Sequence, residues 1–297
     1  MSRVDAVKQG VLEAARRVSP KWESLLLMRG PLAAVLPPDL ETLDRTSGLP
    51  TRELELPGID LRQPGQLERL ATWEGAHDAL FAELRADPVL NRGAAGAPYV
   101  DNQFYGTPDA EVYAAMIADV RPEAIVEIGA GYSTLIARRT IDLLGLGARL
   151  LVVDPEPRTD VAPYADELVR APVEQVDLGR LSLGARAILF VDSSHVVRAG
   201  GDVPHLFNVV VPRLPAGAIV HVHDVFVPYD YPDSYRARLY SEQYVLQALL
   251  SDSPRYRLLF ATHMMCRREP EAMRRVFGRE VARDPRLYGV SLWFEVI

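Results

Sequence analysis

The densest polar chemistry in the sequence follows two apolar runs of the kind that form buried strands. Asp192 ends the first run and His195 comes shortly after it, while His223 and Asp224 end the second run. Ends of neighbouring parallel strands lie about 5 Å apart, so these side chains converge if the two runs are adjacent in a sheet. We therefore expect His195, His223 and Asp224 to be the catalytic residues.

This group of side chains is compatible with three kinds of site. Asp192, His223 and Asp224 carry the donor atoms for a divalent metal ion, which would lower the pKa of a neighbouring hydroxyl and orient it. The nitrogen of His223 would suit a transition metal better than magnesium. In the second alternative, His195 or His223 is a general base that needs no metal. In the third, a histidine inside an apolar run is a hydrogen-bonded core residue.

A second pattern, VEIGAGYST at residues 126–134, places Gly129 and Gly131 where a strand turns into a helix. Glycines there let the backbone approach a ligand closely. A dinucleotide fingerprint would require a third glycine where Thr134 stands, and the carboxylate of Glu127 would repel a pyrophosphate. The same carboxylate would attract an ammonium or a sulfonium, and S-adenosylmethionine carries both.

The elements that must position these residues follow the pattern of βαβ units on a parallel sheet. Apolar runs predict strands at 124–129, 149–154, 167–173, 187–192 and 218–224. Helices are expected between them, at 134–144 after Ser133 and at 203–211 after Asp202. Two further apolar runs, 256–265 and 289–297, follow a helix, and the last alternates as an edge strand does. Ligands of such sheets bind at the carboxyl ends of the strands, where the strand order reverses.

Three features together resemble a class I S-adenosylmethionine-dependent methyltransferase. They are the E-x-G-x-G pattern of Glu127 to Gly131, the acidic residue Asp154 at the end of the second strand, and the seven candidate strands. The resemblance covers residues 101–297. It implies an α/β fold, a Rossmann-like, mostly parallel seven-strand sheet flanked by helices, with Asp154 on the ribose of S-adenosylmethionine. The expected cofactor-binding residues are Tyr105, Glu127, Gly129, Ala130, Gly131, Ser133, Asp154, Glu174 and Asp192.

The two strand ends also resemble the metal site of catechol-type and macrocin-type O-methyltransferases. That resemblance implies a divalent metal held by Asp192, His223 and Asp224, although those enzymes use oxygen donors at the position of His223. The implied reaction moves the methyl group of S-adenosylmethionine to a hydroxyl of a small molecule such as a sugar or natural product. Two alternatives are a metal-dependent oxygenase, with His195, His223 and Asp192 around iron, and a cofactor-binding module without catalysis.

Composition excludes several other classes of function. The chain has 297 residues, of which 48% are hydrophobic and 25% charged, with a formal net charge of −7. This acidic balance argues against a nucleic-acid groove, which needs an excess of clustered Lys and Arg. A membrane span would need about 18 consecutive apolar residues, and none is present. The lone Cys266 fits a reducing compartment, so we expect a cytoplasmic protein.

Residues 1–100 are expected to form a Pro-rich, partly helical extension ahead of the methyltransferase domain at 101–297. Helices are predicted near residues 4–18 and 66–86. The extension would either cover the acceptor side of the site or form a homodimer surface. Five tyrosines within residues 225–244 could wall the acceptor site, although helical spacing would bury Tyr240 or Tyr244 in the core.

Overall fold

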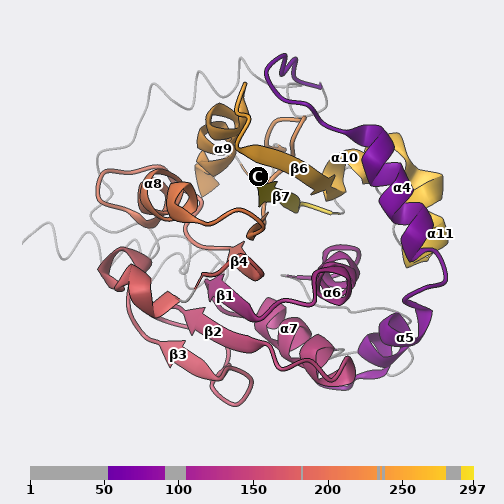
Figure 1. The fold of residues 1–297 in the computed structure, drawn as a ribbon, viewed down its shortest axis with the longest axis horizontal. Coiled ribbons are helices and arrows are strands. Elements are labelled where there is room, and N and C mark those ends of the chain that lie inside the picture. The colour runs from indigo at the N-terminus through magenta and orange to yellow at the C-terminus, as the bar shows by residue number, and fades with distance from the viewer. Residues whose placement is uncertain (1–52, 91–104, 182, 233–234, 236–237, 279–288) are drawn as a thin grey trace, which may run out of the picture. The chain divides into compact units, whose positions relative to one another are not determined.

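The computed structural model describes residues 53–90, 105–181, 183–232, 235, 238–278 and 289–297 (Figure 1). The chain divides into two compact units, Met1–Leu49 with Pro232–Leu239, and Pro50–Tyr231 with Tyr240–Ile297. In the first unit, the Arg238 guanidinium lies 4.2 Å from the ring centre of Tyr235. All helices and strands named below belong to the second unit. The helix expected near 4–18 and the boundary expected at residue 100 lie outside the described residues and stay predictions.

Seven strands among the described residues form one sheet in the order β3-β2-β1-β4-β5-β7-β6. They are β1 Ala124–Ile128, β2 Arg149–Val153, β3 Glu167–Val169, β4 Ala187–Val191, β5 Ile219–Val222, β6 Tyr256–Ala261 and β7 Leu292–Val296. Strands β1 to β5 pair in parallel, whereas β7 is antiparallel to both β5 and β6. This order confirms the predicted Rossmann-like sheet. Its reversal between β1 and β4 marks the place where ligands bind in such folds.

The strands are buried because helices cover both faces of the sheet. Every residue of β4 is buried, as the uninterrupted apolar run of a central parallel strand predicts. The prediction of β7 as an edge strand is wrong, because β7 lies between β5 and β6. Trp293 and Phe294 point to opposite faces, as neighbouring strand residues do, and both are fully buried. The alternation of Leu292, Phe294 and Val296 predicts only one apolar face, so the burial of Trp293 on the opposite face was not expected.

Helices α6 and α7 lie on one side of the sheet, and α8 and α9 lie on the other (Figure 1). The α-helices are α4 Gln63–Trp73, α5 Asp78–Ala86, α6 Asp109–Val120, α7 Tyr132–Leu143, α8 Asp202–His205, α9 Glu242–Leu250, α10 Thr262–Arg268 and α11 Pro270–Phe277. The short helices are η2 Val173–Gln175, η3 Leu178–Leu181, η4 Leu206–Val210 and η5 Val211–Arg213. None of the helices in the described ranges is long and apolar enough to cross a membrane.

Two predicted helices differ from the structure for local reasons. The single helix expected at 66–86 is two helices, α4 and α5, because the chain turns at Gly75, whose φ is +78°. The helix expected at 203–211 divides into α8, the π-helical η4 and the 3₁₀ turn η5. Pro212 lies in η5 and has no N–H to donate, so a regular ladder cannot continue through it.

Candidate functional site

The turn after β1 requires one glycine for its backbone and leaves space beside the other. Gly129 has φ +96°, and a Cβ built there would lie 2.0 Å from the carbonyl oxygen of Asp192. Gly131 is extended and occupies the N-cap position of α7, and a Cβ built on it would meet nothing within 4 Å. The turn therefore packs directly on the chain after β4 while keeping an open side at Gly131. Ser133, expected to cap the helix, lies instead in its first turn.

Asp154 joins the loops after β1 and β2. Its carboxylate accepts the backbone N–H of Ala130 at 2.8 Å and of Glu156 at 2.7 Å. Each carboxylate oxygen has a second lone pair, so both remain able to accept a ligand hydroxyl. The acidic residue expected to bind ribose thus also shapes the glycine turn.

Glu127 lies beneath this turn rather than at its surface. Its side chain is fully buried, where the Tyr113 hydroxyl donates to Oε1 at 3.1 Å and the Thr134 hydroxyl donates to Oε2 at 2.6 Å. Burial raises the pKa of Glu127 to about 8, although these hydrogen bonds and one from Ser133 act in the opposite direction. The carboxyl group is therefore mostly protonated near neutral pH, and a nearby cation would favour its ionised form.

The pH dependence of unfolding tests this buried carboxyl group. Because the pKa of Glu127 is raised from an ordinary 4.5 to about 8, its contribution to stability is complete below pH 4.5 and is lost as the pH rises through 8. The free energy of unfolding should fall by about 2 to 3 kcal/mol between pH 6 and pH 8 from this group. Glu127→Gln, which resembles the protonated form, should remove that part of the slope in urea unfolding. An equal slope in both proteins would contradict a buried, protonated Glu127.

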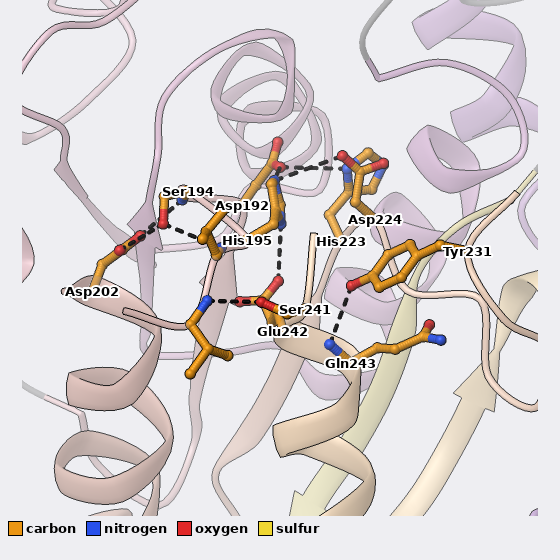
Figure 2. Close-up of polar contacts among 12 residues, drawn as sticks. Asp192, Ser194, His195, Asp202, His223, Asp224, Tyr231, Ser241, Glu242 and Gln243 are labelled. Atoms are coloured by element: carbon orange, nitrogen blue, oxygen red, sulfur yellow. Dashed lines mark hydrogen bonds and ion pairs between the residues drawn. The ribbon is translucent and has the colours of Figure 1, made fainter. Parts of the chain in front are cut away.

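Three predicted metal ligands converge beyond the ends of β4 and β5 (Figure 2). In Asp192, His223 and Asp224, one ligand atom from each residue lies within 4.8 Å of the other two. Nδ1 of His223 is 3.5 Å from Oδ1 of Asp192. This group contains one histidine, His223, and does not include His195.

His195 lies against the same two carboxylates. Its Nε2 is 3.1 Å from Asp192 and 3.6 Å from Asp224, and its Nδ1 is 2.9 Å from Oε2 of Glu242. Burial alone would lower the pKa of His195, but the hydrogen bonds to Asp192 and Glu242 outweigh it and raise the pKa well above the ordinary range. The Tyr240 ring centre lies 4.4 Å from that of His195. Figure 2 shows the imidazole between Asp192 and Glu242.

The start of α9 holds His195 in an unusual conformation. His195 has φ +58°, and its carbonyl accepts the backbone N–H groups of Ser241 at 2.8 Å and Glu242 at 3.1 Å. The Ser241 hydroxyl accepts the N–H of Val197 at 2.9 Å. Asp224 also has a positive φ, of +56°. Left-handed backbone at non-glycine residues is costly and is often found at functional sites.

Sequence reasoning missed two buried carboxylates that touch this group. Glu242 carried no signal beyond its place in the first turn of a helix, although it contacts His195 from 47 residues away. Asp109 begins α6 and lies 3.6 Å from Nε2 of His223. Nothing in the sequence indicates that either helix start comes to these strand ends.

The remaining predicted residues lie around this centre. Tyr105 is buried with its ring centre 4.9 Å from that of His223, so it packs on the polar group. Glu174 lies in η2, and its buried Oε2 has no hydrogen-bond partner among the described residues. Neither Tyr240 nor Tyr244 joins the core as the helical spacing predicted; Tyr244 is 45% exposed. Tyr231 is buried instead, and its hydroxyl accepts the N–H of Gln243 at 3.2 Å (Figure 2).

Comparisons with known proteins add independent findings. Residues 126–225 match the family described as "Methyltransferase domain". An uncharacterized protein of Archaeoglobus fulgidus is 33% identical over 130 residues, which are 42% of this chain and 57% of that protein. The chain therefore matches little more than half the length of this curated relative.

Solved structures of low sequence identity are also similar. The O-methyltransferase TomG of Streptomyces achromogenes, involved in tomaymycin synthesis and in complex with SAM, is 17% identical, with 77% of this chain and 89% of that chain covered and a TM-score of 0.39. The SAH-bound methyltransferase PaMTH1 of Podospora anserina is 16% identical, with 89% and 99% covered and a TM-score of 0.41. A Bacillus cereus O-methyltransferase in complex with SAH is 14% identical, with 78% and 90% covered and a TM-score of 0.40.

The matched family segment runs from β1 to the residue after Asp224 and includes both the glycine turn and the polar group. The seven-strand, mostly parallel sheet is the one that the resemblance predicted. Residues 126–225 of this chain thus match a methyltransferase domain, carried on a seven-strand sheet of the Rossmann-like methyltransferase fold.

Proposed function

We propose that this protein transfers the methyl group of S-adenosylmethionine to a hydroxyl oxygen of a small molecule such as a sugar or natural product. The observation that carries the proposal is the contact between the turn at Gly129 and the backbone of Asp192. This contact brings the glycine turn and the polar group together at one edge of the sheet, which supports a cofactor and an acceptor hydroxyl binding side by side. A ligand seated beside the turn would therefore present its reactive end to the polar group.

The cofactor side of the site suits a cationic nucleoside. The open space at Gly131 admits a ligand, and the two lone pairs left on Asp154 suit the hydroxyls of a ribose. Glu127 lies below the turn and favours an ammonium or a sulfonium over a pyrophosphate, because ionisation of its carboxyl group is assisted only by positive charge.

The polar group fits a divalent metal ion. Nδ1 of His223 is buried without a hydrogen-bond partner among the described residues, and two carboxylates lie beside it. Asp192, His223 and Asp224 would hold the ion, and a donor set with one imidazole suits a transition metal better than magnesium. A bound ion would lower the pKa of an acceptor hydroxyl and orient it.

The chain's own residues would position the acceptor molecule and accept the proton of its hydroxyl. Tyr240 and the pair of Glu242 and His195 fix one wall of the site, and Nε2 of His195 faces its interior. The carboxylates keep this imidazole protonated in the ligand-free site, and only in its neutral form is Nε2 placed to take a proton from a hydroxyl beside Asp192 and Asp224. Holding the acceptor oxygen about 3 Å from the methyl carbon, in line with the leaving sulfur, supplies much of the rate enhancement.

Asp154→Ala tests the cofactor side of the proposal. Loss of a charged hydrogen-bond acceptor removes roughly 1.5 to 3 kcal/mol of binding free energy, so affinity for S-adenosylmethionine should fall about 10- to 100-fold. Isothermal titration calorimetry with S-adenosylmethionine and its demethylated product measures the change. Methyl transfer from labelled cofactor to a panel of sugars, phenols and alcohols then tests the reaction itself.

Asp160→Ala is the matched control. Asp160 also follows β2 and accepts the N–H of the residue two positions on, Ala162, but it is exposed. Its substitution should leave cofactor affinity within about twofold of the unaltered chain. Equal affinities in all three proteins would reject Asp154 as a cofactor residue, and failure of the unaltered protein to bind the cofactor would reject the proposed function.

A further inference from the structure

We propose that Asp109 positions His223 as a metal ligand, by accepting the Nε2–H of the imidazole and leaving Nδ1 as the atom that binds the ion. This inference rests on the metal ion of the proposed function and concerns a residue outside the ligand group. Asp109 would act through His223 and would not touch the metal.

The two nitrogens of His223 face two different carboxylates. Nδ1 faces the ligand group, 3.5 Å from Oδ1 of Asp192, and has no hydrogen-bond partner among the described residues. Nε2 lies 3.6 Å from Oδ2 of Asp109, which is ion-pair distance. Because the side chain of His223 is 5% exposed, water has little access to the ring. The ring therefore lies between the proposed metal site and Asp109.

Asp109 is held in place by elements that do not belong to the ligand group. It begins α6, its Oδ2 accepts the N–H of Val290 at 2.9 Å, and its carbonyl accepts the hydroxyl of Tyr105 at 3.3 Å. Its side chain is 6% exposed, and Oδ1 has no hydrogen-bond partner among the described residues. A buried carboxylate oxygen without a hydrogen-bond partner is unfavourable, so this side chain is suited to accept a hydrogen bond from the Nε2–H of His223.

This arrangement has a clear chemical consequence for a bound metal. A histidine that ligates a metal commonly donates its other ring N–H to a carboxylate, which fixes the tautomer and the ring orientation and raises the basicity of the ligand. Removing such a partner typically lowers metal affinity 10- to 100-fold. Asp109 would thereby strengthen the one nitrogen ligand of the group and favour the metals that prefer imidazole.

The test is a titration of the full chain, freed of metal by a chelator, with Co²⁺ monitored by its visible absorption. Asp109→Asn should bind Co²⁺ about 10- to 100-fold more weakly than the unaltered protein. Asp119→Asn is the matched control, since Asp119 lies on the same helix but accepts hydrogen bonds from Arg69 and Trp73. Its Co²⁺ affinity should stay within about twofold. Equal affinities for Asp109→Asn and the unaltered protein would overturn the inference.

A second measurement needs no substitution and therefore does not depend on whether Asp109→Asn folds. In the Co²⁺-loaded protein, an imidazole that binds through Nδ1 and donates Nε2–H to a buried carboxylate should give a shifted, slowly exchanging N–H proton resonance that disappears in D₂O. Absence of that resonance would contradict the role of Asp109 even if metal binds. If the unaltered protein binds no Co²⁺, this inference fails, whereas calorimetry with S-adenosylmethionine decides separately on methyl transfer.

Discussion

Gly129→Ala is expected to lower the free energy of unfolding by about 3 to 5 kcal/mol. Two costs combine at this position. The φ of +96° is strained for any residue with a side chain, and the new methyl group would meet the carbonyl oxygen of Asp192 at 2.0 Å. Backbone strain of this kind costs about 1 to 3 kcal/mol, and overpacking against a rigid neighbour costs about as much. Urea unfolding followed by circular dichroism measures the loss.

Gly131→Ala separates the fold from the ligand site. A methyl group there meets nothing within 4 Å, and the extended backbone accepts any residue. This variant should unfold within about 1 kcal/mol of the unaltered chain but bind S-adenosylmethionine more weakly, because the methyl group enters the open side of the turn. A Gly129→Ala protein as stable as Gly131→Ala would show that the turn does not pack on Asp192.

Glu242→Leu should destabilise the protein by about 3 to 5 kcal/mol. Glu242 is fully buried and holds Nδ1 of His195 at 2.9 Å. Burial raises the pKa of Glu242, while the hydrogen bond to His195 opposes that rise. Removing Glu242 leaves the buried Nδ1–H of His195 without its acceptor, which is why the expected loss is large. Chemical denaturation at pH 7 measures it.

Two further variants sharpen this result. Glu242→Gln keeps the shape and one acceptor oxygen, so its loss should be smaller, about 1 to 2 kcal/mol. Glu271→Leu makes the same exchange in the first turn of α11, where the side chain is 72% exposed, and should change stability by less than about 0.5 kcal/mol. Should Glu242→Leu resemble Glu271→Leu, the buried pair contributes nothing to the folded state.

Much of the sheet could be predicted, because an uninterrupted apolar run in the sequence indicates a buried strand. Apolar runs marked β1 to β5, and the residues after them were expected at the ligand-binding edge. Asp192, His223 and Asp224 were expected together because adjacent parallel strands bring their ends together, and the structure groups them. The glycine pair was recognised as a turn, although the sequence could not show that only Gly129 is pressed against a neighbouring backbone.

The parts that could not be predicted depend on packing between distant segments. Glu242 and Asp109 begin two helices on opposite sides of the sheet, and their contacts with His195 and His223 follow from where those helices dock. A short local sequence pattern carries no information about where a helix docks on the sheet. The same reason explains the position of β7, whose antiparallel place between β5 and β6 depends on the whole order of the sheet.

The close packing of Gly129 on the backbone after β4 also restricts how this protein could be redesigned. The backbone of Asp192 and Ser193 cannot shift toward Gly129 without displacing the turn after β1. Under the proposed function, a change of acceptor would therefore be easier to engineer at Tyr240, whose ring lies beside His195 and does not support the turn. Libraries that leave 129–131 and 192–195 untouched should keep the largest share of folded clones.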